Sequence, residues 1–111
     1  MLIDFLTTKL EKLCLNGKAL VKEFGKDVGS AFQNRYAFLE AAPSLADVPT
    51  EKPFRRHLLE GDRKGQWSVA VRNGVCICLV PDHDPVPILE NGGVDLKKVT
   101  RVKIVYVGDY H

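Results

Sequence analysis

The sequence contains no hydrophobic segment that approaches the roughly 20 residues needed to cross a bilayer, so we expect no membrane partner. It also lacks an excess of charge of one sign, since 16 Lys and Arg residues stand against 14 Asp and Glu, for a formal net charge of +2. So small a net charge does not identify a nucleic-acid-binding protein. Whether this protein binds nucleic acid has to be judged from how its charges are distributed. The opening MLIDFLTTKLEKL carries charges throughout and is unlike a signal peptide, which predicts a cytoplasmic protein.

Cysteine is scarce, and the odd number of three argues against a disulfide framework and for a reducing compartment. The sequence also has no Walker loop, no Gly-x-Gly-x-x-Gly, no nucleophile elbow and no His-Glu-x-x-His pattern. Nucleotide-dependent and hydrolase-triad chemistries therefore have no support, and we expect no cofactor. Cys76 and Cys78 form a Cys-x-Cys pair without a second ligand pair at zinc-like spacing. Burial as small hydrophobic residues is favoured over a metal site.

The first half of the chain has the periodicity of helices. Hydrophobic residues recur every three or four positions from Ile3 to Cys14, which predicts one helix. Thr8 and Glu11 have the spacing of a capping box at its start, although Asp4 could also start it. A second helical stretch is predicted from about residue 18 to 39, broken or bent at Gly25, because its apolar residues keep the same spacing. Ala42-Pro43 ends it, and residues 44–50 are typical of a short capped turn.

The second half changes to the period of two that is typical of strands. Residues 67–72 alternate, residues 75–80 are rich in β-branched side chains, and Asn73-Gly74 between them favours a type I′ hairpin turn. A two-residue turn predicts two pairs of cysteine and valine, Cys76 with Val71 and Cys78 with Val69. We therefore expect both cysteines to be buried, unpaired and in apolar surroundings.

Two further strands and a long connection complete the outline. Residues 54–59 and 102–107 are predicted strands, while Asp82 to Lys98 holds prolines, Gly92-Gly93 and many polar groups and is predicted to be a loop. All 111 residues then form one α+β domain, with two N-terminal helices packed on a small, mostly antiparallel sheet.

Basic side chains concentrate in two parts of the second half. The first cluster consists of Lys52, Arg55, Arg56, His57, Arg63, Lys64 and Arg72, and the second of Lys97, Lys98, Arg101 and Lys103. If the sheet brings them together, they give a near-neutral protein one positive face suited to a phosphate backbone. The alternative interpretation is an ordinary solvated surface, in which Glu60 and Asp62 dilute the charge.

The last three residues are Asp109, Tyr110 and His111. All three side chains can serve in proton transfer, and tyrosine can also stack on an unpaired base. If the strand continues, Asp109 and His111 project to one side of the sheet and Tyr110 to the other, unless the end curls. The alternative is a polar chain end without a function.

Residues 60–69, EGDRKGQWSV, resemble the L-K-G-D-R-x-G-x-W-S-I segment of HigB-like toxins, the plasmid-maintenance killer proteins of the RelE/ParE superfamily. The ending of residues 106–111, YVGDYH, is similar to the terminal D-Y-H of that family. Residues 10–13 and the helix exit at 41–45 fit the same pattern. Residues 83–100 resemble the loop of a variant group that has a longer connection before the last strand.

The resemblance implies a RelE-like fold, with two helices on one side of a strongly twisted sheet and RNA on the other. It implies the toxin of a type II toxin–antitoxin system, a ribosome-dependent messenger RNA endonuclease (mRNA interferase) that inhibits translation. The implied partners are the ribosome, mRNA and a cognate HigA-like antitoxin, with no small-molecule cofactor. Cleavage would proceed by attack of a ribose 2′-hydroxyl on the adjacent phosphate, which needs a base, an acid and cations.

The resemblance also implies roles for individual residues. His57 and His111 would transfer protons or contact phosphate, Tyr110 would stack or donate a hydrogen bond, and Asp109 would orient a neighbour. Five basic residues would bind RNA: Arg55, Arg56, Arg63, Lys64 and Arg72.

Two positions depart from the family pattern. The lysine common before the Gly-Asp turn is replaced by Glu60, and the arginine common after the hairpin turn is absent, where Val75-Cys76-Ile77 stands instead. Each such cation is typically worth about 2.7–4 kcal/mol in the transition state. The alternative hypothesis is therefore a catalytically degenerate relative that retains antitoxin or RNA binding without cleavage.

Overall fold

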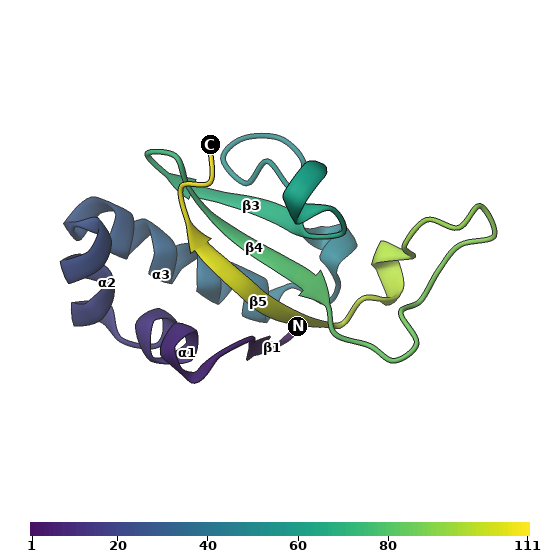
Figure 1. The fold of residues 1–111 in the computed structure, drawn as a ribbon, viewed down its shortest axis with the longest axis horizontal. Coiled ribbons are helices and arrows are strands. Elements are labelled where there is room, and N and C mark those ends of the chain that lie inside the picture. The colour runs from purple at the N-terminus through teal and green to yellow at the C-terminus, as the bar shows by residue number, and fades with distance from the viewer.

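The computed structural model describes residues 1–111 and has an α+β architecture, in which helices cover one face of a five-stranded sheet (Figure 1). The predicted fold class is thus confirmed. Every neighbouring pair of strands is antiparallel except the pair β1–β5. The strands, in their order across the sheet, are β1 (Leu2–Phe5), β5 (Arg101–Gly108), β4 (Val75–Pro81), β3 (Trp67–Arg72) and β2 (His57–Leu58).

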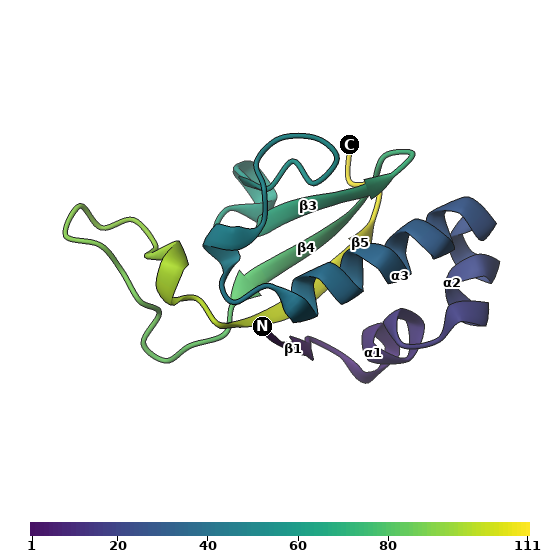
Figure 2. The same cartoon turned by 180° about the vertical axis from the view of Figure 1, so that it is seen from behind.

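Three helices, α1 (Thr8–Cys14), α2 (Gly17–Phe24) and α3 (Lys26–Ala41), lie on one side of the sheet (Figure 2). The predicted second helical stretch consists of two helices that meet at Gly25, where a break or bend was expected. Gly25 adopts a φ of 90°, a backbone conformation that residues with a side chain rarely adopt. Leu45–Asp47 forms the expected short turn after Pro43. No helix combines the length and the hydrophobicity that a membrane span requires.

The first residues of the chain, Leu2–Phe5, form a strand, so the prediction of a helix is wrong over residues 3–5. This segment pairs in parallel with β5, and exposed residues alternate with half-buried ones along it. The helix begins only at Thr8, where the Thr7 hydroxyl accepts a hydrogen bond from the backbone N of Leu10 at 3.1 Å. Pairing with a distant strand therefore overrides the local helical spacing.

The hairpin turn forms as predicted, with positive φ at Asn73 (53°) and Gly74 (82°). Its pairing differs, because a bulge between Ala70 and Arg72 shifts the register by one residue. The prediction that the cysteines lie opposite valines is wrong, since the pairs are Cys76 with Ala70 and Cys78 with Ser68. Directly paired residues share a face of the sheet, so both cysteines point away from the helices.

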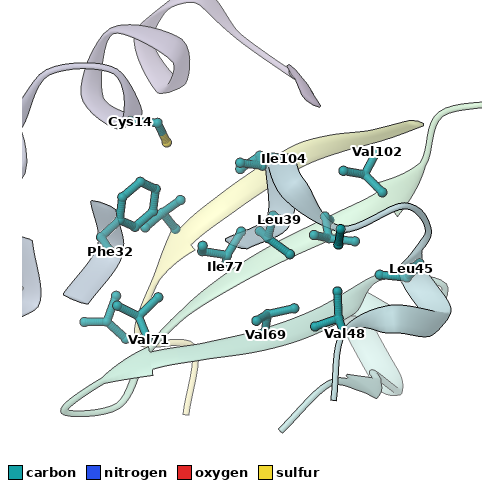
Figure 3. Close-up of a cluster of buried hydrophobic side chains, with 14 of the residues drawn as sticks. Cys14, Phe32, Leu39, Leu45, Val48, Val69, Val71, Ile77, Val102 and Ile104 are labelled. Atoms are coloured by element: carbon teal, nitrogen blue, oxygen red, sulfur yellow. The ribbon is translucent and has the colours of Figure 1, made fainter. Parts of the chain in front are cut away.

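The hydrophobic core lies between the helices and the sheet (Figure 3). Phe32 and Leu39 of α3 are fully buried there, together with Val69 of β3 and Ile77 of β4. The bulge makes this arrangement possible, because it places Val69 directly opposite Ile77, so that both apolar side chains lie on the face that α3 covers. The helical face of the sheet therefore holds the apolar side chains, and the other face is left for polar groups.

Two predicted segments of the second half are less regular. Of the expected strand at residues 54–59, only His57–Leu58 pairs with β3. The predicted loop from Asp82 to Lys98, which we call the arm, has one isolated bridge between Ile88 and Val94 and a single turn at Leu96–Lys98. It projects from the body of the molecule, whose longest dimension is 44 Å against 27 and 25 Å in the other directions (Figure 1).

Candidate functional site

The candidate site lies on the face of the sheet that the helices leave uncovered. Two neighbouring pockets there share Tyr110. We call the first, of about 360 Å³, the histidine pocket, because His57 and His111 both line it. The second, of about 560 Å³, is lined by Leu59, Glu60, Asp62, Arg63 and Tyr110, and we call it the Arg63 pocket.

The C-terminal residues reach this face because the chain turns after β5 ends at Gly108. The turn is tight, since a Cβ atom at Gly108 would lie 2.6 Å from the Tyr106 hydroxyl. The Tyr110 hydroxyl then donates a hydrogen bond to Oγ of Ser68, a fully buried residue of β3, at 3.1 Å. Burial raises the pKa of Tyr110, so its phenol remains a donor at neutral pH. The end of the chain thus curls rather than continuing the strand.

Asp109 and His111 form an ordered pair beside Tyr110. Oδ1 of Asp109 accepts a hydrogen bond from the backbone N of His111 at 3.0 Å and lies 2.9 Å from Nδ1 of its ring. These bonds lower the pKa of Asp109 below its usual value. Because the carboxylate accepts, Nδ1 carries the proton and Nε2 of His111 is left free. The rings of Tyr110 and His111 stack with 4.4 Å between their centroids.

His57, which also lines the histidine pocket, has a matching arrangement. Its Nδ1 lies 2.7 Å from the backbone O of Arg55. A carbonyl oxygen only accepts, so the neutral ring carries its proton on Nδ1 and leaves Nε2 without a partner. Arg55 itself adopts a φ of 48°, an uncommon value for a residue other than glycine, and this conformation belongs to the loop that presents its carbonyl to His57.

Cations line both pockets, three in the histidine pocket and one in the Arg63 pocket. Arg55 and Arg72 line the histidine pocket together with Lys52. The Arg63 guanidinium lies 4.0 Å from the ring centroid of Tyr106 and 5.9 Å from that of Tyr110. Its Nη1 donates a hydrogen bond to Oε1 of Gln66 at 3.2 Å. The 3-10 turn Gly61–Arg63 therefore holds its arginine against the aromatic residues of the sheet.

Not every predicted basic residue reaches the site. Arg56 points elsewhere, because its Nη1 donates to the backbone O of Leu45 at 2.7 Å and its guanidinium lies 5.7 Å from the Trp67 ring centroid. Burial there lowers its pKa. Lys64 is exposed and lines neither pocket.

The second basic cluster lies away from both pockets, in the arm and at the beginning of β5. Lys103 is 3.9 Å from Asp82, which takes up part of its charge. The two clusters do not line a common site. The cations that line the two pockets therefore come from the first cluster alone.

Sequence reasoning missed several residues of the site. Ser68, which accepts the hydrogen bond from Tyr110, precedes the core residue Val69 in β3. This alternation was the only feature of the sequence that placed Ser68 on the face opposite the core. Cys76 lines the histidine pocket, and Cys78 lies fully buried beside it, where burial raises its pKa to about 11. Both cysteines are buried and free, as predicted, but they underlie the candidate site rather than the core.

No protein-family model matches the chain, and no curated protein matches it significantly.

Proposed function

We propose that this protein is the toxin of a type II toxin–antitoxin system and cleaves messenger RNA on the ribosome. The observation that carries the proposal is the histidine pocket itself. It presents two imidazole rings, His57 and His111, each held through Nδ1 and each with a free Nε2. Arg55 and Arg72 supply positive charge beside them. Such a set suits a reaction that needs a base, an acid and a cation at one phosphate.

The reaction that fits this set is transesterification at a ribose. One imidazole, neutral, removes the proton of the 2′-hydroxyl, and the oxygen attacks the adjacent phosphorus. The other imidazole, protonated, gives its proton to the leaving 5′-oxygen as the P–O5′ bond breaks. The products are a 2′,3′-cyclic phosphate and a 5′-hydroxyl, so no water is consumed. Arg55 and Arg72 would offset the extra negative charge of the transition state, for which one well-placed donor is typically worth about 2.7–4 kcal/mol.

The neighbouring residues would bind and orient the RNA. Tyr110 and His111 form a stacked pair on which an unpaired base can continue the stack. Asp109 would keep the His111 ring in one tautomer. Arg63 and Lys64 would contact the phosphate backbone. The resemblance to HigB-like toxins, over residues 60–69 and 106–111, points to the same face.

The proposal includes a cytoplasmic location and a cognate antitoxin. Expression of the protein without an antitoxin should then arrest growth, and His57→Ala and His111→Ala should each relieve the arrest. His83→Ala is the matched control, because His83 lies at the base of the arm and lines neither pocket. Normal growth on verified expression of the unmodified protein would contradict the proposal, as would relief by His83→Ala alone.

A second candidate function is RNA or antitoxin binding without cleavage, and a feature of the Arg63 pocket favours it. Glu60 and Asp62 both line this pocket beside Tyr110, and neither forms an ion pair. Their carboxylates would repel a phosphate there, and Cys76 contributes no cation to the adjoining pocket. If this candidate is right, only the double variant Glu60→Lys with Cys76→Arg cleaves mRNA. Cleavage by the unmodified protein would dismiss it.

A further inference from the structure

The outer edge of β3 has an unusual partner next to the histidine pocket. β2 pairs with β3 over only two residues, His57 with Ser68 and Leu58 with Trp67. Beyond that point the backbone N of Ala70 donates to the backbone O of Phe54 at 2.7 Å. The loop that leads into His57 is therefore attached to β3 through Phe54.

Arg35 of α3 completes this edge from the helical side of the sheet. Its Nε donates to the backbone O of Ala70 at 2.8 Å, and its Nη2 donates to the backbone O of Val71 at 3.4 Å. Both carbonyls lie at the bulge of β3. The planar guanidinium thus bonds two successive carbonyl groups at the point where the ladder is irregular.

Arg35 also contacts the loop directly. Its guanidinium carbon lies 4.6 Å from the centroid of the Phe54 ring, and Phe54 packs on Phe38 of the same helix with 4.4 Å between centroids. No carboxylate pairs with Arg35, and burial lowers its pKa. The Arg35 guanidinium binds backbone carbonyls of β3 and the aromatic ring of Phe54, and it thereby holds β3 and the loop together.

The loop held in this way sets the position of His57. Phe54 is followed by Arg55, and the Arg55 carbonyl is the acceptor 2.7 Å from Nδ1 of His57. A shift of Phe54 along the edge of β3 would move that carbonyl and release the ring. His111 has no such dependence, because its Nδ1 is held by Asp109 within the C-terminal turn.

We infer that Arg35 is a positioning residue that fixes the ring of His57 from the opposite side of the sheet. The placement of His57 stands on the contacts alone, whereas its consequence for cleavage rests on the proposed function. A residue that merely ties α3 to the sheet would affect the stability of the whole domain. A positioning residue affects His57 and leaves His111 unchanged.

The direct test is the tautomer of each histidine, read from the ring ¹⁵N chemical shifts of the full-length protein. In the unmodified protein both rings should show the proton on Nδ1. In Arg35→Met we expect His57 to lose this signature and His111 to keep it. An unchanged His57 would overturn the inference, and so would equal changes at both histidines.

Two further variants keep the test decisive. Tyr36→Ala is the matched control, because Tyr36 is the next residue of α3 and its ring stacks on Phe5 and Phe32, away from β3. It should lower the melting temperature without changing His57. If Arg35→Met does not fold, Arg35→Lys replaces it, since a lysine keeps the charge but lacks the fork that spans two carbonyls. A folded Arg35→Lys protein with an unchanged His57 tautomer would overturn the inference.

Cleavage assays separate this inference from the proposed function. If the protein cleaves mRNA, Arg35→Met should lower kcat on the order of a hundredfold with little change in KM, as misplacement of a catalytic group does. Arg35→Met combined with His57→Ala should be no worse than His57→Ala alone, and an additive loss would contradict the inference. If the protein cleaves nothing, the proposed function fails, and the tautomer measurement still decides the role of Arg35.

Discussion

The two faces of the sheet bury their side chains under different kinds of cover. On the helical face Ile77 of β4 lies under α3, in a core that long side chains fill from several elements. On the face without helices, which we have called the uncovered face, the neighbouring residues Cys76 and Cys78 are also buried. There the C-terminal turn and the loop that carries Arg63 lie over them in place of helices. The first cover consists of regular structure and apolar contacts. The second depends on single contacts such as the hydrogen bond from Tyr110 to Ser68.

Neighbouring residues of one strand, β4, therefore contribute differently: those on the helical face stabilise the fold, and those on the uncovered face lie at the candidate site. Apolar burial supplies most of the free energy of folding, and that burial lies almost entirely between the helices and the sheet. The uncovered face carries hydroxyl, imidazole and guanidinium groups whose removal exposes little apolar surface. Substitutions on the helical face should therefore change the free energy of unfolding, and those on the uncovered face should change function.

The largest effect is expected from Phe32→Ala on the helical face. Phe32 is fully buried, and truncation of such a residue typically lowers the free energy of unfolding by about 3–5 kcal/mol. Urea unfolding followed by circular dichroism measures the change. A loss below about 0.5 kcal/mol would show that the core does not carry the stability, since that is the size of an ordinary surface effect.

The second prediction concerns the thiols that lie on the two faces. Burial raises the pKa of Cys14 to about 12 and that of Cys78 to about 11. Only the thiolate reacts, so at pH 8 both should be alkylated about a hundredfold more slowly than a free cysteine, or slower still. Mass spectrometry after timed labelling gives the rates. Cys76, which is 6% exposed, should also resist.

The same two pKa shifts predict how stability responds to alkaline pH. A thiol whose pKa is raised in the folded state stabilises the fold below its ordinary pKa of 9.0. This contribution should be lost as the pH rises from there toward 11 and 12. Rapid alkylation of Cys78 but not Cys14 would show instead that the C-terminal turn and the loop that carries Arg63 readily open away from the sheet.

A smaller effect is expected from Tyr110→Phe. The change removes the hydroxyl that bonds Ser68 and keeps the aromatic ring, so the free energy of unfolding should fall by about 0.5–1.5 kcal/mol. If the protein cleaves mRNA as proposed, the rate of cleavage should also fall, because the C-terminal turn that carries His111 is then held less firmly. The companion variant Ser68→Ala should reproduce the result. A loss of stability as large as that of Phe32→Ala would erase the distinction between the faces.

The smallest effect is expected at Asp109. Its lowered pKa means that the hydrogen bonds from His111 persist throughout the ordinary carboxyl range and are lost only as the pH falls below it, through the pKa of the folded state. The backbone amide resonance of His111 should report this transition in an NMR titration. Asp109→Asn should remove the transition and leave the melting temperature unchanged. A transition at the usual aspartate pKa would contradict the pairing.

The sequence predicts the parts of this arrangement that depend on neighbouring residues. The hairpin turn at Asn73-Gly74, the fold class and the burial of the cysteines follow from local patterns, and the structure confirms them. The register of the hairpin does not follow, because its bulge is held by Arg35, which lies far away in the sequence. The strand Leu2–Phe5 was missed for the same reason, since its partner is β5.

The candidate site divides in a similar way. His57, Tyr110 and His111 were selected by residue type and by resemblance, and all three line the histidine pocket. The selection of Arg56 assumed that neighbouring basic residues point the same way, but Arg56 turns toward Leu45. The contact between Tyr110 and Ser68 joins positions 42 residues apart, so no local pattern reveals it.

The most direct test of the proposed function is cleavage of messenger RNA by the purified protein on programmed ribosomes, with ribosome-free RNA as the control. We expect cuts only on the ribosome, and we expect His57→Ala and His111→Ala each to abolish them while both variants unfold at the temperature of the unmodified protein. Absence of cleavage by the unmodified protein, together with cleavage by Glu60→Lys with Cys76→Arg, would contradict the proposal and identify a toxin scaffold that no longer cuts.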